Sequence, residues 1–545
     1  MAPASERTIT FTEVNKLNKP TLTYIYSLPS SDVTPLTIGS EKGTTGRLDI
    51  AHTSSPSTSW SLSSLRSFLV NVFLPAGYPT SVSDDYTPYQ IFDSLQAFSS
   101  SIAGLLASRA VLQGVGVGNA DASPTSALLL HILQDTSGRI ATILFAHRVG
   151  TALEPECKMY RFAADIFNDL AMVLDCLSPM IPAGLCRVTV LSAAGVLRAL
   201  CGVAGGSSKA SLGAHFALWG NLAEVNAKDS SQETVISLIG MLVGSLVVSH
   251  ITGFTATWLT LILLLTMHLS LNYAAVRSVQ MTTLNRQRAN IIFSSLLSSD
   301  PDFADFVSNP NHQDERSLQQ KHIGRQVKPL TPAQVAKQER IFDAGSALKW
   351  YPSFSSSSAE QPQVLGSCEI GVSVRQFFSQ SSHTTSRGPN SLKTNLPLRE
   401  ITALFEGEAY ILSLTPASTN ISATVILKQR NPTADTDRSD SDPKTNPQLK
   451  AWMHALLAAK ILSLTSASTS ISTPVSGDDN PTPVQVDHVL QVVSRTLDYL
   501  NGHGRFQAYI DSLRETGWEV NGDGEGGGSA LETRVVGRVV VSSLS

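Results

Sequence analysis

Residues 234–276 read TVISLIGMLVGSLVVSHITGFTATWLTLILLLTMHLSLNYAAV, the most informative segment of the chain. Its 43 residues include no Asp, Glu, Lys or Arg. As one helix it would be about 65 Å long, twice the ~30 Å thickness of the hydrocarbon layer. A break at His250–Gly253 therefore predicts two membrane-spanning helices, at about 233–250 and 254–276. The alternative, a hairpin buried in a soluble protein, is disfavoured because Trp258–Leu265 has no polar face.

Basic residues follow the second predicted span directly, at Arg277, Arg286 and Arg288. Positively charged residues next to a span favour the cytoplasmic side of a membrane. We therefore expect the chain after residue 276 to lie on the cytoplasmic or topologically equivalent side, and the 250–253 turn to face the opposite compartment.

Weaker apolar segments precede this pair of spans. A bundle would let their charged residues face protein or water-filled space instead of lipid. The glycines at 240 and 244 form a GxxxG step, which lets a neighbouring helix approach closely. We expect a polytopic transmembrane helical bundle whose earlier segments lie at about 89–113, 124–134, 138–150, 161–181, 185–204 and 210–223.

The composition excludes several classes of protein. The 545 residues carry a formal net charge of −4, so no overall basic field indicates nucleic-acid binding. Charged residues make up 15%, below the roughly 25% of soluble globular chains. The 5 cysteines are odd in number and form no CxxC pair, which disfavours a disulfide framework or a zinc site.

The remaining regions complete a mainly α chain. Its C-terminal part predicts a smaller α+β domain, with strands at 408–414 and 421–428, helices at 448–464 and 486–516, and a last strand at 534–541. A short helix is expected at about 332–342. The domain boundaries are a flexible N-terminal arm at 1–59, a membrane helical domain at 60–290, a polar linker region at 291–394 and the α+β domain at 395–545.

An internal repeat is a further hypothesis. The stretch VLQGVGVG (111–118) precedes apolar helices and Gln134–Ser137, and VLRALCGVAGG (196–206) precedes an apolar helix and Lys228–Ser231. Repeats with helices broken at glycine are common in transporters, where the break lines a binding site. The alternative is chance similarity among segments rich in glycine and alanine.

The first polar cluster of a candidate ligand site consists of Gly114, Gly116 and Gly118. Their spacing does not match the GxGxxG fingerprint of dinucleotide sites. We interpret them as a helix break, with Ser123 capping the next helix and Pro124 at its first position. The exposed helix ends would hold a small polar ligand or ion; the alternative is close packing.

The second cluster consists of Asp165, Asn168 and Asp169, which share one helical face. Carboxylates in an apolar helix are costly in lipid and usually mark an ion path, a relay or a buried pair. The alternative is a helix at the membrane surface with its acidic face in water.

The third cluster consists of Lys228, Asp229, Gln232 and Glu233, at the mouth of the predicted bundle. A solvated helix start is one interpretation, and a gate or ligand contact is the other. The chain carries none of the GxSxG, P-loop, HExxH and EF-hand motifs, and its histidines lack metal-ligand spacing. We therefore expect neither an enzyme nor a metal site.

Several long motifs carry a resemblance to a known family. They are FLPAGYPTSVSDDYTPYQ (73–90), QGVGVGNA (113–120), DIFNDLAM (165–172) and AKDSSQET (227–234), and looser matches lie at 449–455 and 513–518. The chain resembles the root UVB sensitive family. The resemblance implies a membrane-associated protein, with plant members linked to ultraviolet-B responses in roots, auxin transport and vitamin B6 homeostasis. It supplies no catalytic residues.

These observations lead to one hypothesis and two alternatives. The three clusters would line a site through which the protein moves or senses a small polar solute. Alternatively, it is a membrane scaffold that recruits family members or other proteins through its C-terminal domain. A third interpretation is pyridoxal phosphate handling, for which Lys228 is the one motif lysine able to form a Schiff base. The expected partners are the lipid bilayer and a solute, not nucleic acid.

Overall fold

The computed structural model divides the chain into two compact units. One unit comprises Met1–Tyr86 and Phe216–Val235, and the other Thr87–His215 and Ile236–Ser545. The structure describes residues 8–14, 20–27, 47–52, 62–115, 124–308, 328–343, 345–352, 361–379, 397–416, 420–429, 446–469, 483–520, 531 and 539–540.

Three antiparallel strands lie in the segment expected to be a flexible arm. They are β1 (Thr8–Val14), β2 (Pro20–Ser27) and β3 (Arg47–His52), with β2 in the centre. Phe11 pairs with Tyr24, and Tyr24 pairs with Ile50. Threonine alternates with aromatic and β-branched residues in β1 and β2, a composition that suits a pleated surface. Helix α1 (Leu62–Phe73) follows.

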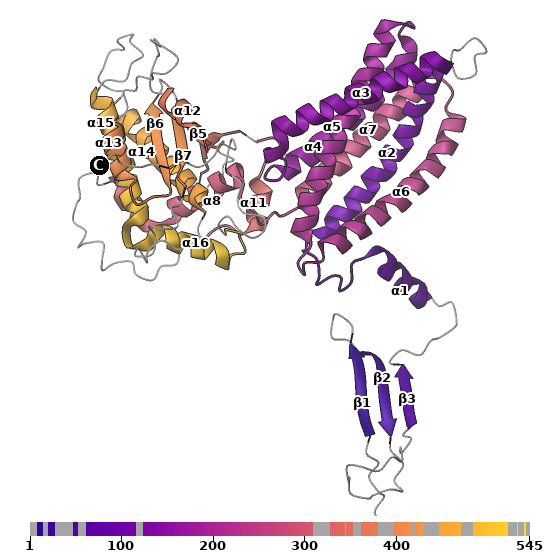
Figure 1. Ribbon diagram of the computed structural model, residues 1–545, viewed down its shortest axis with the longest axis horizontal. Helices are drawn as coiled ribbons and strands as arrows, with labels where there is room; N and C mark the ends of the chain where they lie inside the picture. The colour runs from indigo at the N-terminus through magenta and orange to yellow at the C-terminus, as the bar shows by residue number, and fades with distance from the viewer. Residues whose placement is uncertain are drawn as a thin grey trace, which may run out of the picture. The chain divides into compact units, whose positions relative to one another are not determined.

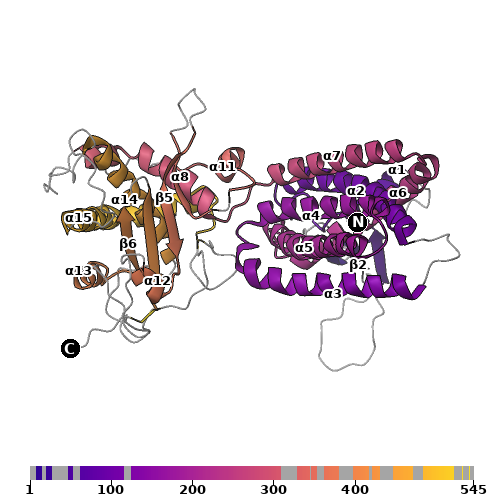
Figure 2. The ribbon, with the colours of Figure 1, turned by 90° about the horizontal axis from the view of Figure 1, so that it is seen from above.

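Long helices run side by side in a bundle (Figures 1 and 2). They are α2 (Tyr86–Val115), α3 (Pro124–Val149), α4 (Cys157–Leu177), α5 (Leu185–Phe216), α6 (Leu222–His250) and α7 (Phe254–Ser278). Among the described residues, α2, α5, α6 and α7 are long and apolar enough to cross a membrane, by length and composition. The predicted break at His250–Gly253 is confirmed, since α6 ends and α7 begins there.

Two breaks that were expected between helices are absent. Gln134–Ser137 does not divide α3, because the Ser137 hydroxyl donates to the Gln134 carbonyl inside a continuous helix. The Gly-rich stretch 196–206 likewise lies inside the unbroken α5. Neither stretch contains proline, and isolated glycines are tolerated in a helix that is otherwise supported. The motifs compared as a repeat therefore occupy different places in their helices: 111–115 is the end of α2, whereas 196–206 is the middle of α5.

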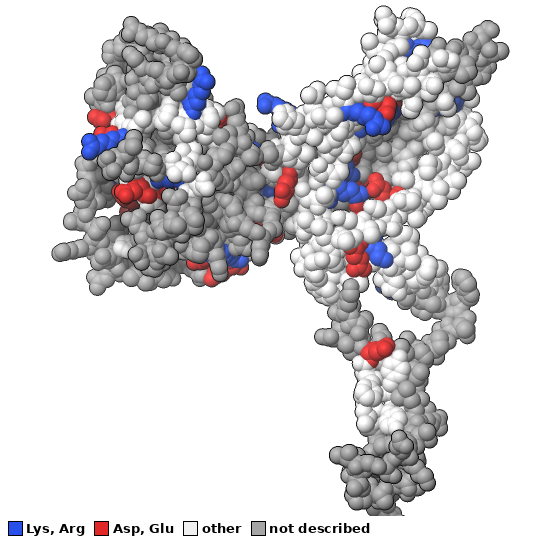
Figure 3. Space-filling view, in the orientation of Figure 1, with Lys and Arg blue, Asp and Glu red and all other residues white. Residues whose placement is uncertain are grey.

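The GxxxG step of α6 packs closely against α2, as predicted. A Cβ added at Gly240 would lie 2.8 Å from Ser101 Cβ and 3.0 Å from the Phe98 carbonyl oxygen. A Cβ at Gly244 would lie 2.8 Å from Leu105 Cδ1. The other side of α6 exposes leucines such as Leu242, at 61%. Figure 3 shows the bundle covered mostly by uncharged side chains.

A four-stranded sheet forms the centre of the C-terminal domain. Its strands are β4 (Ala347–Trp350), β5 (Gln363–Ile370), β6 (Tyr410–Pro416) and β7 (Ile421–Leu427), in the order β4-β5-β7-β6. β5 and β7 are parallel, and the other pairs are antiparallel. The two predicted strands are confirmed as β6 and β7. β4 and β5 lie in the region expected to be a linker.

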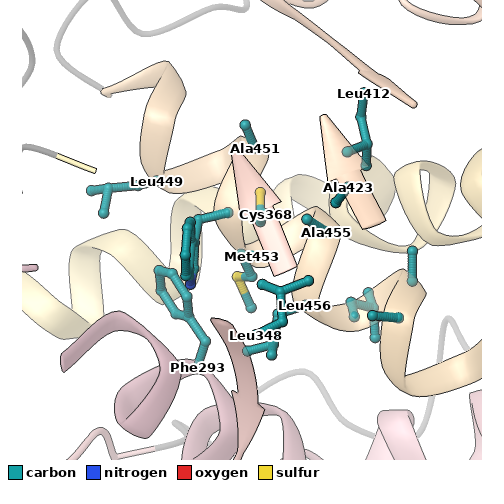
Figure 4. Packing of buried hydrophobic residues seen from close by; sticks show 14 of the residues in the cluster. Phe293, Leu348, Cys368, Leu412, Ala423, Leu449, Ala451, Met453, Ala455 and Leu456 are labelled. Carbon is teal, nitrogen blue, oxygen red and sulfur yellow. The ribbon is translucent and has the colours of Figure 1, made fainter. Parts of the chain in front are cut away.

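Helices pack around this sheet, and one core joins them (Figure 4). The core extends from Leu284 to Leu531, so it begins well before the expected boundary at residue 395. Most of the expected last strand lies outside the described residues; Val539 bridges to Lys428. The helices are α8 (Arg286–Ser299), α9 (Pro301–Ser308), α11 (Pro332–Gln338), α12 (Val374–Ser379), α13 (Leu398–Leu404), α14 (Pro447–Thr469), α15 (Pro483–Asn501) and α16 (Arg505–Glu515).

Helix α14 is buried on nearly all sides, and its one histidine is held neutral. His454 Nδ1 lies 2.9 Å from the Tyr410 hydroxyl, and Nε2 lies 3.1 Å from the Val493 carbonyl oxygen. In the neutral ring, Nε2–H donates to Val493 while Nδ1 accepts from Tyr410. Burial lowers the pKa of His454 to about 3.

Replacing Gly240 with leucine tests the helix contact. The added side chain must push α6 away from α2, and overpacking of this kind typically costs about 1–3 kcal/mol. Gly202→Leu is the matched control, since no atom lies within 4 Å of a Cβ built at Gly202 in α5. Denaturant titration of the detergent-solubilised protein should show a lower free energy of unfolding for Gly240→Leu and an unchanged one for Gly202→Leu. Equal losses in both variants would contradict the close contact.

The neutral His454 predicts a pH dependence of stability. The unfolded chain, in which histidine titrates near pH 6.5, binds a proton more readily than the folded chain. The free energy of unfolding should therefore fall as pH drops from about 6.5 toward 3, by at most ~1.4 kcal/mol per unit from this residue. His454→Gln should flatten that slope between pH 6.5 and 4.5 in the full-length protein. If the free energy of unfolding depended on pH in the same way in both proteins, His454 would not be the source of the pH dependence.

Candidate functional site

Charged and polar side chains are buried between α2, α4 and α7, among otherwise apolar helices. We name this group the α2–α4–α7 cluster. Arg161 and His268 within it are only 7% and 1% exposed. Its members are Tyr89, Asp93 and Gln96 of α2, Arg161, Asp165 and Asp169 of α4, and His268 and Asn272 of α7.

The Arg161 guanidinium connects α4 to α2. Nη2 lies 2.7 Å from Asp93 Oδ1, and Nη1 lies 3.0 Å from Asp165 Oδ2. Nε donates to the Tyr89 hydroxyl at 3.3 Å. Positions 161, 165 and 169 follow at intervals of four, so one face of α4 presents all three charges to the bundle interior. One buried cation therefore holds two carboxylates from different helices.

His268 connects the same face of α4 to α7. Its Nδ1 lies 2.7 Å from Asp169 Oδ1, and its Nε2 lies 3.6 Å from Asp165 Oδ2. The Asn272 amide donates to Asp165 Oδ2. A carboxylate only accepts hydrogen bonds, so an imidazole between two of them gains from carrying a proton on both nitrogens. The arrangement can bind and hold a proton.

Some atoms of the cluster have no hydrogen-bond partner among the described residues. They are Asp169 Oδ2, Asn272 Oδ1 and Gln96 Oε1, and all three are acceptors. Buried polar atoms are nearly always paired, and the exceptions often mark functional positions. A buried water, or another group with N–H or O–H donors, would complete these hydrogen bonds.

The structure thus accounts for the second predicted cluster. Asp165 and Asp169 face the bundle interior, so the alternative of an acidic face in water is wrong. Asn168 is half-buried and donates to Ser100 Oγ at 3.4 Å. Whether these residues bind a ligand stays a prediction.

The first predicted cluster is described only in part. Gly114 is buried in the last turn of α2, where a Cβ would lie 3.2 Å from Ser178 Oγ. Its carbonyl accepts from the Arg187 guanidinium. Gly116 and Gly118 lie outside the described residues. Helix α3 begins at Pro124, as predicted.

The third predicted cluster belongs to the other compact unit, where it contacts α1. The Lys228 ammonium donates to the carbonyls of Asn71 and Val72, at 2.6 and 2.9 Å. The Gln232 amide donates to the Phe73 carbonyl at 2.6 Å. Asp229 is buried and Glu233 is exposed. A Schiff base at Lys228 would therefore have to break two hydrogen bonds.

Local sequence patterns did not identify Arg161, His268 or Asn272 as members of the α2–α4–α7 cluster. Arg161 stands four residues before Asp165, an ion-pair spacing that went unused. His268 and Asn272 are one turn apart in a span without charged residues, which is itself a sign of a buried polar face. Asp93 could not be paired with Arg161 from the sequence, because the contact joins helices 68 residues apart.

A second buried charge group lies where α4 and α7 meet α8 and α11. The Glu339 carboxylate accepts from Arg288 Nη2 at 2.7 Å and from Lys158 Nζ at 2.6 Å. Burial alone would raise the pKa of Glu339, but Arg288 and Lys158 outweigh it and hold that pKa below its usual range. Arg286 and Arg288 are both buried, so two of the three arginines used to orient the spans do not face a lipid surface.

Replacing Arg161 with glutamine should destabilise the protein strongly. Removing one partner of a buried ion pair typically costs about 3–5 kcal/mol, because the remaining charge is left uncompensated. Arg139→Gln is the matched control: its i,i+4 pair with Asp135 is exposed, and such pairs contribute less than ~1 kcal/mol. Denaturant titration should separate the two variants, and adding Asp93→Asn to Arg161→Gln should recover part of the loss. Equal effects of Arg161→Gln and Arg139→Gln would contradict the buried network.

Comparisons with known proteins cover the helical region. Residues 59–300 match a family model described as the vitamin B6 photo-protection and homoeostasis domain. RUS family member 1 of Dictyostelium discoideum is 45% identical over 229 residues, which are 41% of this chain and 43% of the relative. Protein root UVB sensitive 3 of Arabidopsis thaliana is 36% identical over 230 residues, 42% of this chain and 52% of the relative. The chain thus spans about half the length of these curated relatives. No solved structure matches it.

Proposed function

Because the chain belongs, through residues 59–300, to the root UVB sensitive family, we propose that it is a multi-pass membrane protein that moves or senses a small polar solute. The description of the matching domain makes vitamin B6 homoeostasis the process to test first. The one observation that carries the proposal is the α2–α4–α7 cluster. Charges buried inside apolar helices are expensive, and in membrane proteins they usually serve a solute or proton pathway.

The membrane placement rests on the exposed surface of the helices. In the most apolar part of helix α6 only 11% of the residues are buried. Leu238, Leu242 and Leu246 are exposed along one side of this helix. Contiguous apolar surface of this extent is unfavourable in water and is matched by a lipid environment.

Extraction with alkaline carbonate tests the membrane placement. The full-length protein should stay in the membrane pellet, and its release into the supernatant would contradict the placement.

The hydrogen-bond chemistry of the cluster favours a particular solute class. The atoms of the cluster that lack partners among the described residues are all acceptors, so the cluster has a surplus of acceptors. A solute with hydroxyl and ring N–H donors fits this surplus, whereas a phosphate would add negative charge. We therefore expect the unphosphorylated vitamers of B6 to interact more strongly than pyridoxal phosphate.

Asp169→Asn in proteoliposomes tests the solute site. The substitution keeps the size of the side chain but removes the charge that faces His268, so uptake of labelled pyridoxine should fall at least tenfold. Asp135→Asn, in the exposed pair with Arg139, is the matched control and should retain uptake. Folding is checked by the elution profile of each purified variant. Unchanged uptake in a folded Asp169→Asn protein would reject the site.

A scaffold function is the second candidate, and the size of the C-terminal core favours it. That core begins at Leu284, so a deletion from residue 395 would separate β4 and β5 from β6 and β7. A chain truncated after Gln280 removes that core whole; it also carries Lys158→Met, because the truncation takes away the Glu339 carboxylate that pairs with the buried Lys158. A transporter should keep measurable pyridoxine uptake, whereas a scaffold should lose its cellular function while the helical region stays in the membrane.

A further inference from the structure

Helix α1 is fixed by its C-terminal end to the first turns of α6. The last carbonyls of any helix lack intrahelical donors. In α1 these carbonyls, on Asn71, Val72 and Phe73, accept from the side chains of Lys228 and Gln232. A lysine at a helix C-terminus is also favoured by the helix dipole. Lys228 and Gln232, in the polar first turns of α6, therefore hold the C-terminal end of α1 in place.

One face of α1 is apolar and exposed. Leu65, Phe68, Leu69 and Val72 follow at the spacing of one helical face, and Phe68 is 62% exposed. Arg66 and Asn71 lie to either side of this face and are also exposed. A short helix with an apolar face and a polar back is typical of segments that lie in a membrane surface.

The attachment sets the depth at which α1 would meet a membrane. The charge-free part of α6 begins at Thr234, two residues or about 3 Å of helix rise after Gln232. The turn before α6 exposes Trp219 and Leu218 in the same compact unit. Tryptophan is enriched where hydrocarbon meets the polar headgroups. Helix α1 is therefore tied to α6 at the polar boundary of a candidate span.

We propose that α1 lies in the plane of the membrane surface, with Leu65, Phe68, Leu69 and Val72 among the acyl chains. The occupant of its apolar face is the lipid bilayer, because the face is attached directly beside the start of an apolar helix that itself requires lipid. The Lys228 and Gln232 contacts keep α1 at this level. The inference rests on the proposed membrane placement of α6, and is independent of the solute.

Spin labels on the full-length protein in phosphatidylcholine nanodiscs test this arrangement. The accessible Cys186 and Cys201 are replaced by serine, and the buried Cys157, Cys176 and Cys368 are kept. One cysteine at a time is then introduced, as Phe68→Cys, Asn71→Cys or Leu242→Cys, and the protein without an introduced cysteine is the control for background labelling. Molecular oxygen concentrates in the bilayer and a polar nickel chelate in water. We expect the label at 68 to relax with oxygen and to be protected from nickel, with the reverse at 71.

The label at Leu242 separates the two proposals. If the label at 242 is accessible to the nickel chelate, the membrane placement of α6 is wrong. If it is lipid-exposed while the labels at 68 and 71 are both open to nickel, only the α1 proposal fails. The label at 68 could also be protected from the nickel chelate by a second copy of the chain. In that case the protection would persist in detergent without lipid and would depend on protein concentration, and the α1 proposal would be overturned. Replacing Lys228 and Gln232 by alanine should increase the mobility of the label at 68 at least twofold.

Discussion

The buried Arg161 guanidinium is the interaction on which the helical region depends. It lies between Asp93 of α2 and Asp165 of α4, and Asp165 also accepts from Asn272 of α7. Apolar helices pack almost equally well in several rotations, since one leucine surface resembles another. A buried ion network removes that freedom, because each misplaced helix would leave a charge uncompensated in a medium of low dielectric constant. The network thus specifies which faces of α2, α4 and α7 meet.

The sequence was most informative where a single physical constraint dominates. The charge-free run at 234–276 predicted two helices and the turn at His250–Gly253, because 43 such residues are about twice as long as one membrane-spanning helix. The strands β6 and β7 and the helix α14 also followed from local patterns. Gly240 and Gly244 were identified as a packing site because close approach of helices requires residues without side chains.

Pairings between distant residues could not be obtained in the same way. Nothing in the local pattern near Asp93 names Arg161 as its partner, and Glu339 meets Lys158 across 181 positions of the chain. The strands β4 and β5 were missed because β4 is short and the segments flanking them are polar. The Gly-rich stretch 196–206 was misread as a break because glycine weakens a helix locally, while the rest of α5 maintains it.

Helix α4 carries members of both buried charge groups. Lys158 in its first turn pairs with Glu339, which follows α11, while Arg161, Asp165 and Asp169 on the next turns belong to the α2–α4–α7 cluster. Rotating or sliding α4 would change both groups at once. A shift of α4 that changed the contacts of His268 would therefore also change the contacts of Glu339, about three turns of helix away.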